Sequence, residues 1–171
     1  MENIIINDSN LNNNEIQKNG NKVRAVLLSD NKILVSHYGG VILLPGGSID
    51  KGETADDAII RELKEETGIV YDANNLKELL LLEYYQLNYP TRRDEVINRL
   101  IRTKFYFGQY RGIDLKSINR TENEVKDNFH LDLIDLDEFA SLINESSENP
   151  RKKYFDRENQ EVIKVLKKVR N

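Results

Sequence analysis

Residues 46–69 read GGSIDKGETADDAIIRELKEETGI and combine a glycine pair, an acidic loop and a helix-forming run. Glu62, Glu65 and Glu66 are three and four residues apart, so an α-helix would place them on one face within a single turn. Like charges at this spacing repel one another by roughly a few tenths of a kcal/mol, and no lysine or arginine lies between them on that face. Carboxylates and backbone carbonyls are the ligands that Mg²⁺ takes from proteins. The segment therefore predicts a divalent-cation site on a helix.

The same residues resemble the Nudix box, the signature of the Nudix hydrolases. The box asks for a glycine, then a glutamate, then Arg-Glu followed by an aliphatic residue, and finally Glu-Glu, any residue, glycine and an aliphatic. The chain matches this pattern without departure at Gly47, Glu53, Arg61, Glu62, Leu63, Glu65, Glu66, Gly68 and Ile69. Such a pattern is far more specific than a lone glycine-rich turn. A solvated acidic helix is the alternative reading, and the full pattern argues against it.

The resemblance implies roles for individual residues of the box and its surroundings. It implies that Mg²⁺, or Mn²⁺ as a substitute, is held by the Gly46 carbonyl and the carboxylates of Glu62, Glu65 and Glu66. Within this set, Glu62 is our first candidate for the general base. Arg61 is expected to pair with Glu53 and to hold the loop against the helix, because the family uses these two positions in that way.

Three further residues are candidates outside the box. Some family members draw a base or a metal ligand from a later loop, and Glu124 is the best placed residue here, a solvated loop glutamate being the alternative. Tyr85 lies 16 positions after Ile69, where a tyrosine resembles the diadenosine polyphosphate hydrolases. A base could stack on its ring, although packing within a strand is the alternative. Arg92 lies in a polar, turn-rich segment and is a candidate substrate contact.

The resemblance implies hydrolysis of a nucleoside diphosphate linked to another group, with a nucleoside triphosphate or a diadenosine polyphosphate as examples. One alternative is removal of pyrophosphate from an RNA 5′ end, for which Arg92, Arg93, Arg99, Arg102 and Lys104 offer a modest basic track. The net charge of −4 argues against a nucleic-acid partner. The other alternative is a nucleotide-sensing module without catalysis, but such modules usually lose box carboxylates. The resemblance also allows a homodimer.

Composition describes one globular domain, with 171 residues of which 39% are hydrophobic and 32% charged. The absence of cysteine excludes disulfides, thiolate zinc sites and a thiol nucleophile. No apolar run reaches the roughly 18 residues of a membrane span, and the first residues lack the charge and apolar pattern of a signal peptide. We therefore expect a cytoplasmic protein that acts on a small-molecule nucleotide, with no membrane partner.

The order of predicted elements completes the expectation for the fold. The asparagine-rich residues 1–20 are predicted to form a flexible tail with at most a short edge strand, followed by a single Nudix-like domain over residues 21–171. Strands are expected at 22–28, 32–38, 41–44, the second half of 76–87, 99–110 and 130–134. Helices are expected between a Thr54 cap and Gly68, at 135–144 and at 154–169, with a polar loop at 117–128. The last helix should cover the sheet with Phe155, Val162, Leu166 and Val169. Together with the resemblance, this order predicts an α/β (α+β) fold, an α/β/α sandwich around a mixed sheet.

Overall fold

The computed structural model describes residues 1–120, 122–126 and 128–170. Its strands are β1 (Glu2–Ile6), β2 (Lys18–Ser29), β3 (Lys32–Tyr38), β4 (Val41–Leu43), β5 (Leu76–Pro90), β6 (Val96–Gln109) and β7 (His130–Asp135). Its helices are α1 (Ala55–Thr67), α2 (Glu122–Lys126), α3 (Leu136–Leu142) and α4 (Lys152–Arg170), with short 3₁₀ helices η1 (Asn13–Glu15) and η2 (Ala73–Asn75). Within these described ranges, no helix has the length and apolar character needed to cross a membrane.

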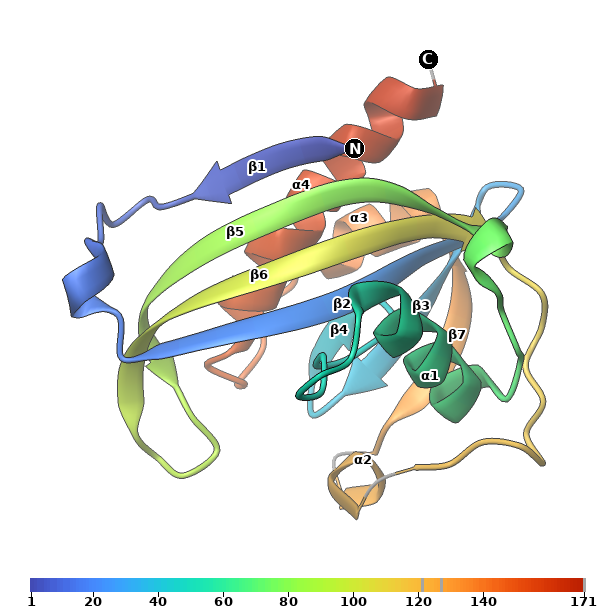
Figure 1. Ribbon diagram of the computed structural model, residues 1–171, viewed down its shortest axis with the longest axis horizontal. Coiled ribbons are helices and arrows are strands. Elements are labelled where there is room, and N and C mark those ends of the chain that lie inside the picture. The colour runs from blue at the N-terminus through green and yellow to red at the C-terminus, as the bar shows by residue number, and fades with distance from the viewer. Residues whose placement is uncertain (121, 127, 171) are drawn as a thin grey trace.

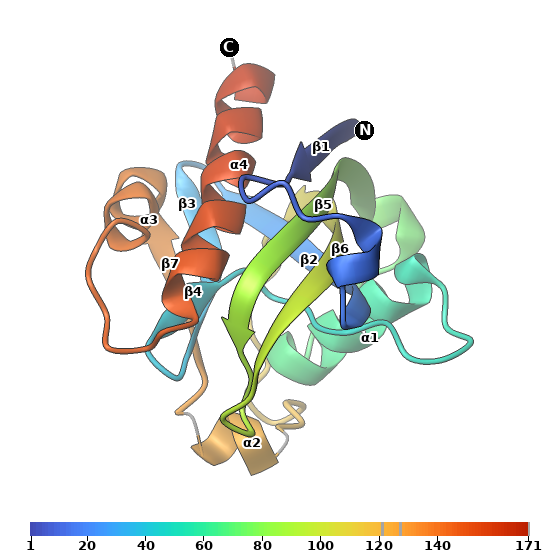
Figure 2. The same ribbon diagram turned by 90° about the vertical axis from the view of Figure 1, so that its left-hand side faces the viewer.

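The strands form one mixed sheet in the order β1-β5-β6-β2-β3-β4, and β7 pairs with β3. β1 runs parallel to β5 and β2 runs parallel to β6, whereas β5 and β6, like the strands around β3, pair antiparallel. In Figure 1, α1 lies in front of the sheet and α4 behind it. Figure 2 shows the same two layers from the side. The predicted α/β/α sandwich is confirmed.

Each face of the sheet has its own apolar core. α1 buries Ala58, Ile59 and Leu63 against the side chains that β2 directs to that face. On the opposite face, α4 packs against β4 and β5 and α3 packs against β3 and β7. The buried side chains there include Leu80, Leu82, Phe105, Phe139, Val162 and Leu166. Burial of apolar surface, at about 25 cal/mol per Å², holds both helical layers to the sheet. For α1 this fixes which side of the helix is left to carry its glutamates.

α1 begins and ends where the sequence predicts. The Thr54 hydroxyl accepts a hydrogen bond from the Asp57 amide at 3.1 Å, which is an N-cap. At the other end, Gly68 has φ 75° and its amide donates to the Lys64 carbonyl at 2.9 Å. A Cβ on Gly68 would also lie 2.3 Å from the Asp114 carbonyl oxygen. Both the left-handed backbone and the close approach therefore require glycine there.

Residues 1–20 are not the flexible tail that composition predicts; the short edge strand is the part of that prediction that is correct. β1 pairs with β5 over its whole length, and Ile6 is 2% exposed within the core under α4. Leu11 is also buried. β2 begins at Lys18 instead of residue 22, because its first residues pair with β6. The buried apolar side chains and the strand pairing stabilise an ordered N-terminal segment despite its polar composition. Residues before the predicted domain boundary at residue 21 therefore belong to the sheet.

Three local predictions also need correction. β5 includes the whole of the predicted segment 76–87, because it is hydrogen-bonded between β1 and β6. Alternate residues of the leucine run that favours a helix by count, Leu80 and Leu82, are buried in the core. Val169 is 63% exposed, so the apolar stripe of α4 ends before it. Within the predicted loop 117–128, residues 122–126 form α2, while Thr121 and Asp127 lie outside the described residues.

Candidate active site

The glycine pair after β4 lies against the edge of β2. The Val23 amide donates to the Gly47 carbonyl at 2.9 Å, so the loop continues the sheet. Gly46 has φ 132°, and a Cβ on it would lie 2.3 Å from the Val23 carbonyl oxygen. A Cβ on Gly47 would lie 2.3 Å from Oε1 of Glu62. The first glycine is therefore required by the approach of β2. A Cβ on the second would displace the carboxylate of Glu62 from its present position.

Glu66 connects α1 to this loop. Its side chain is buried, with 6% of the residue exposed, and its carboxylate accepts a hydrogen bond from the Gly46 amide at 3.0 Å. Burial raises the pKa of Glu66 to about 8, against the effect of the Arg24 guanidinium, and the charges of Glu62 and Glu124 add to the increase. The site therefore holds a carboxylate in surroundings that disfavour its negative charge unless a cation is close.

Glu62 lies one turn earlier on the same side of α1. Its Oε1 accepts a hydrogen bond from Nη1 of Arg61 at 2.9 Å. Burial raises the pKa of Glu62, and the hydrogen bond and charge of Arg61 oppose this. Glu65 lies nearer to solvent, with its side chain 38% exposed and its carboxylate 3.5 Å from the Arg61 guanidinium. The structure thus directs Glu62 and Glu66 inward and leaves Glu65 at the rim.

Arg61 pairs with Glu53, as the resemblance implies. Its Nε and Nη2 donate to the two carboxylate oxygens of Glu53 at 2.8 and 2.9 Å, which is a bidentate ion pair. Nη2 also donates to the Ser48 carbonyl at 3.0 Å, and the Glu53 carboxylate accepts from the Asp50 amide at 3.0 Å. The Arg61 and Asp50 hydrogen bonds lower the pKa of Glu53 to about 2. One guanidinium therefore ties the acidic loop to α1 and, through its bond to Glu62, to the site.

Arg24 on β2 is a site residue that the sequence analysis missed. It is buried, and its guanidinium donates to the carbonyl oxygens of Leu44 and Gly46. The two backbone groups of Gly46 are thus shared between the two sides of the site, with the amide bonded to Glu66 and the carbonyl to Arg24. The positive charge of Arg24 lowers the pKa of both Glu62 and Glu66. The carbonyl expected to bind a metal is bonded to a cation in this structure.

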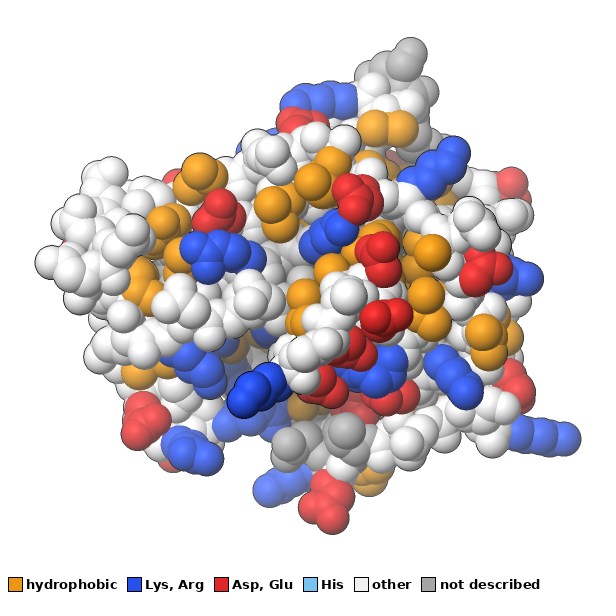
Figure 3. Space-filling view, viewed as in Figure 1, with side chains coloured by type: hydrophobic (Ala, Val, Ile, Leu, Met, Phe, Trp, Pro, Cys, Tyr) orange, Lys and Arg blue, Asp and Glu red, His pale blue; other side chains and the backbone are white. Residues whose placement is uncertain are grey.

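These groups border a hollow of about 720 Å³ between the glycine loop, β2, β6 and the start of α4. Small-molecule sites have volumes of about 300–1,000 Å³. Five predicted site residues line the hollow: Gly46, Glu62, Glu66, Arg92 and Glu124. Glu53, Arg61 and Glu65 lie behind this lining and reach it through the bond of Arg61 to Glu62. In Figure 3, acidic side chains at the lower centre lie beside a group of lysine and arginine side chains.

Tyr85 is separated from the carboxylates. Alternate residues of a strand point to opposite faces, and Tyr84 is buried on the face that α4 covers. Tyr85 points to the other face, where its hydroxyl donates to Oδ1 of Asn13 at 3.3 Å. Arg92, by contrast, lines the hollow; its guanidinium donates to the Tyr38 hydroxyl and lies 5.0 Å from that ring. Of the two expected substrate contacts, only Arg92 is brought to the site.

The wall opposite the glutamates carries cations that the sequence analysis did not assign to the site. Lys18, Lys22 and Arg24 are an even number of residues apart on β2, so they share one face, and Arg99 of β6 is the register partner of Lys18. Arg93 and Arg151 complete the cationic lining. The alternation of charge in KNGNKVR, residues 18–24, is the signal that could have found it. A strand predicted to begin at residue 22 leaves Lys18 in the tail and hides that alternation.

The donor set suits a hard divalent cation. Among the residues that the structure describes, no three carboxylate or histidine groups stand close enough together to hold a metal as they are placed. Glu62 and Glu66 nevertheless face one hollow beside the Gly46 carbonyl, and burial raises the pKa of both carboxylates. A cation between two such groups removes the cost of their ionisation. The chemistry of these oxygen ligands fits Mg²⁺ or Mn²⁺.

A family model described as the NUDIX domain matches residues 18–157. The ADP-ribose pyrophosphatase of Methanocaldococcus jannaschii is 39% identical over 59 residues, which cover 32% of this chain and 35% of that protein. The 8-oxo-dGTP diphosphatase of Haemophilus influenzae is 50% identical over 48 residues, which cover 28% of this chain and 32% of that protein. The aligned part therefore spans about a third of the length of these curated relatives.

A solved structure supports the same assignment at the level of the fold. The NUDIX domain of NrtR from Shewanella oneidensis, complexed with ADP-ribose, superposes with a TM-score of 0.58 at 16% identity, covering 95% of this chain and 96% of that one. The family match takes in the glycine loop, α1 and both walls of the hollow. On these grounds the chain belongs to the NUDIX domain family.

Proposed function

We propose that this chain hydrolyses a phosphoric anhydride bond in a small nucleotide, a nucleoside diphosphate linked to another group. The observation that carries the proposal is the buried carboxylate of Glu66, bonded to the Gly46 amide beside Glu62, across a hollow from a cationic wall. A diphosphate bridge carries several negative charges, so binding and attack both need positive charge nearby. The pyrophosphatase and diphosphatase named among the relatives support this reaction class.

The site also supports Mg²⁺, or Mn²⁺ in its place, as the cofactor. Glu62, Glu66 and the Gly46 carbonyl would hold the ion, with Glu65 and Glu124 as further candidate ligands. When bound, the ion would neutralise phosphate oxygens and lower the pKa of a water molecule. Burial of Glu62 and Glu66 prepares them for this role, because it removes the water that would otherwise solvate their charges.

The remaining residues have roles that follow from their contacts. Glu62 is the proposed general base, since burial raises its pKa and so makes it a better proton acceptor than an exposed carboxylate. Arg61 orients Glu62 through the bond at 2.9 Å, and the bidentate pair with Glu53 fixes Arg61. Arg24 holds the Gly46 carbonyl in place from β2. Arg61, Glu53 and Arg24 are therefore positioning residues in this proposal.

One alternative substrate has an observation in its favour. The exposed Arg92 and Arg93 lie at the rim of the hollow, where an RNA 5′ end could contact them. The net charge of −4 and the volume of the hollow, about 720 Å³, favour a small nucleotide instead. A sensing module without catalysis is not favoured, because every carboxylate of the box is present.

The test is hydrolysis of a panel of nucleotides with Mg²⁺ and with Mn²⁺, followed by chromatography of the nucleoside monophosphate formed, using the wild type, Glu66→Gln and Glu83→Gln. Glu83 is a matched control, because it is a carboxylate on β5 that pairs with Arg102 and does not line the hollow. We expect turnover in the wild type and the control, and its loss in Glu66→Gln. Binding without turnover of any substrate would favour the sensing module, and turnover of triphosphorylated RNA alone would favour the RNA reading.

A further inference from the structure

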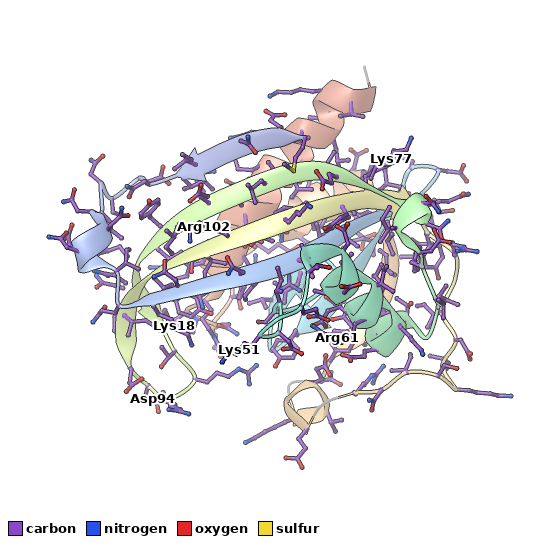
Figure 4. The ribbon with its side chains drawn as sticks, in the orientation of Figure 1. Lys18, Lys51, Arg61, Lys77, Asp94 and Arg102 are labelled. Atoms are coloured by element: carbon purple, nitrogen blue, oxygen red, sulfur yellow. The ribbon has the colours of Figure 1, made fainter. Side chains whose placement is uncertain are left out.

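A row of cations leads away from the glutamates along one face of the sheet. Lys22 lies two residues before Arg24 on β2, and Lys18 lies six residues before it, with Arg99 as the register partner of Lys18. At about 3.3 Å per residue, Lys18 is about 20 Å from Arg24 along the strand. Figure 4 shows Lys18 at the start of β2, near the turn that carries Asp94, and Arg61 over the other end of the site. The row is therefore longer than a diphosphate.

Four cations of the hollow form no ion pair within the described part of the chain, unlike several cations on the outer surfaces of the protein. Among the described residues, Lys18, Lys22, Arg99 and Arg151 form no ion pair within 4.0 Å, although all four line the hollow. On the outer surfaces, Arg102, Lys104, Arg157 and Lys168 are each paired with a carboxylate. Lys18, Lys22, Arg99 and Arg151 therefore bring positive charge into one hollow without a carboxylate within ion-pair distance among the described residues.

Holding these charges together is unfavourable for the protein alone. Desolvation, followed by the charges of Arg24 and Arg99, lowers the pKa of Lys22 to about 7, and the carboxylate of Glu158 on α4 opposes the shift. Desolvation also lowers the pKa of Arg99, whose guanidinium lies 3.1 Å from the centre of the Tyr89 ring and donates to Gln86. Glu158 is one carboxylate facing several cations. An anionic ligand would relieve this repulsion.

Besides Lys22, small and apolar groups line the space between the two ends of the row. Gly20 lies between Lys18 and Lys22 on the same face, and a Cβ there would lie 2.9 Å from the side chain of Ile101. Tyr89 and Phe155 also line the hollow. A sugar or a base fits the small and apolar surface that Gly20, Ile101 and Tyr89 provide beside the charge of Lys22.

We propose that Lys18, Lys22, Arg99 and Arg151 form a second anion site, which binds a phosphate monoester carried by the substrate on the far side of a sugar from the hydrolysed diphosphate. This assignment rests on the proposed function. It narrows the substrate class to dinucleotide-like molecules that carry a phosphate in addition to the diphosphate bridge. With the diphosphate beside Arg24, a monoester one sugar away would reach Lys22, two residues along β2, and the long side chains of Arg99 and Lys18 would reach it from farther along the row.

The experiment uses two pairs of probes that differ by one phosphate monoester: NADP⁺ against NAD⁺, and coenzyme A against dephospho-coenzyme A. Calorimetry of the full chain in EDTA measures the ratio of dissociation constants within each pair, without metal or turnover. We expect the phosphorylated member of at least one pair to bind at least about tenfold more tightly, the size of one charge-assisted hydrogen bond. Lys22→Gln and Arg99→Gln should bring this ratio close to one.

Arg102→Gln is the matched control, because Arg102 lies on β6 but points to the other face, where it pairs with Glu83 at 3.0 Å. It should keep the wild-type ratio. Lys22→Gln covers the case in which Arg99→Gln disturbs the fold, since the Lys22 side chain forms no hydrogen bond with the residues that the structure describes. Equal binding of both members in both pairs, or a preference that persists in Lys22→Gln, would overturn the second anion site. Mg²⁺-dependent hydrolysis of the diphosphate bridge is measured separately by chromatography of the two monoester products. Hydrolysis without the binding preference overturns only this inference, and the preference without hydrolysis overturns only the proposed function.

Discussion

The carboxylate of Glu66 accepts a hydrogen bond from the amide of Gly46 at 3.0 Å, and this bond joins the inner side of α1 to the loop that follows β4. The carbonyl of the same glycine accepts a hydrogen bond from Arg24. One peptide segment is therefore held between a buried acid and a buried base from different elements.

Glu66→Gln should abolish Mg²⁺-dependent turnover and, without metal, change the pH dependence of stability. Because the folded-state pKa of about 8 exceeds the ordinary 4.5, the folded protein keeps a proton that the unfolded chain releases between these values. The free energy of unfolding in EDTA should therefore fall as pH rises from about 4.5 to 8, and the variant should lack this fall. Urea titrations across this range measure it. An unchanged pH profile in Glu66→Gln would contradict the buried placement.

Glu53→Gln should remove a stabilisation that acts at neutral pH. The pKa of Glu53 is lowered to about 2 in the folded protein, so the unfolded chain takes up the proton first as pH falls. The contribution is complete above about 4.5 and is lost as pH falls from there to 2. Acid unfolding followed by circular dichroism should show that stability falls less steeply between pH 4.5 and 2 in Glu53→Gln than in the wild type. Asp94→Asn, at an exposed turn, is the control and should unfold like the wild type.

Lys22→Met should stabilise the fold near neutral pH while weakening anion binding. The ammonium of Lys22 has its pKa lowered to about 7, so the folded protein releases a proton that the unfolded chain keeps between about 7 and 10.5. The free energy of unfolding of the wild type should rise with pH over this range. In Lys22→Met this rise should be missing, and stability at pH 6.5 should increase by roughly 1 kcal/mol. Thermal melts at pH 6.5 and 9 compare the two proteins. A lower stability of Lys22→Met at pH 6.5 would contradict the proposed repulsion between Lys22 and its cationic neighbours.

Ile6→Ala should cost about 2–4 kcal/mol of stability, since it removes a buried side chain from the core under α4. Its neighbour Ile5 is 68% exposed on the same strand, so Ile5→Ala should change stability by no more than about 0.5 kcal/mol. Chemical unfolding of the three proteins tests whether β1 belongs to the folded domain. Equal and small effects of the two substitutions would support the flexible N-terminal tail that composition predicts.

The local features of the site could be predicted from the sequence because they depend on residues close together in the chain. The spacing of Glu62, Glu65 and Glu66 places them on one turn, and Thr54 and Gly68 mark the ends of their helix. The pair between Arg61 and Glu53 also spans only a loop and two helical turns, and the family pattern implied it. No contact across the sheet is needed for any of these features.

The cationic wall, the separation of Tyr85 from the site and the place of β1 depend on which strands become neighbours. Arg24 meets Gly46 because β2 takes the glycine loop along one edge, and Lys18 meets Arg99 because β2 and β6 pair in parallel over a long register. A change of one residue in a strand register turns every side chain to the opposite face, so the face of Tyr85 cannot be read from its distance to the box. The sequence by itself determined the family, the acidic helix and its clamp, since these are set by short-range spacing. The tertiary structure decided what faces the acids across the hollow, because long-range strand pairing selects those partners.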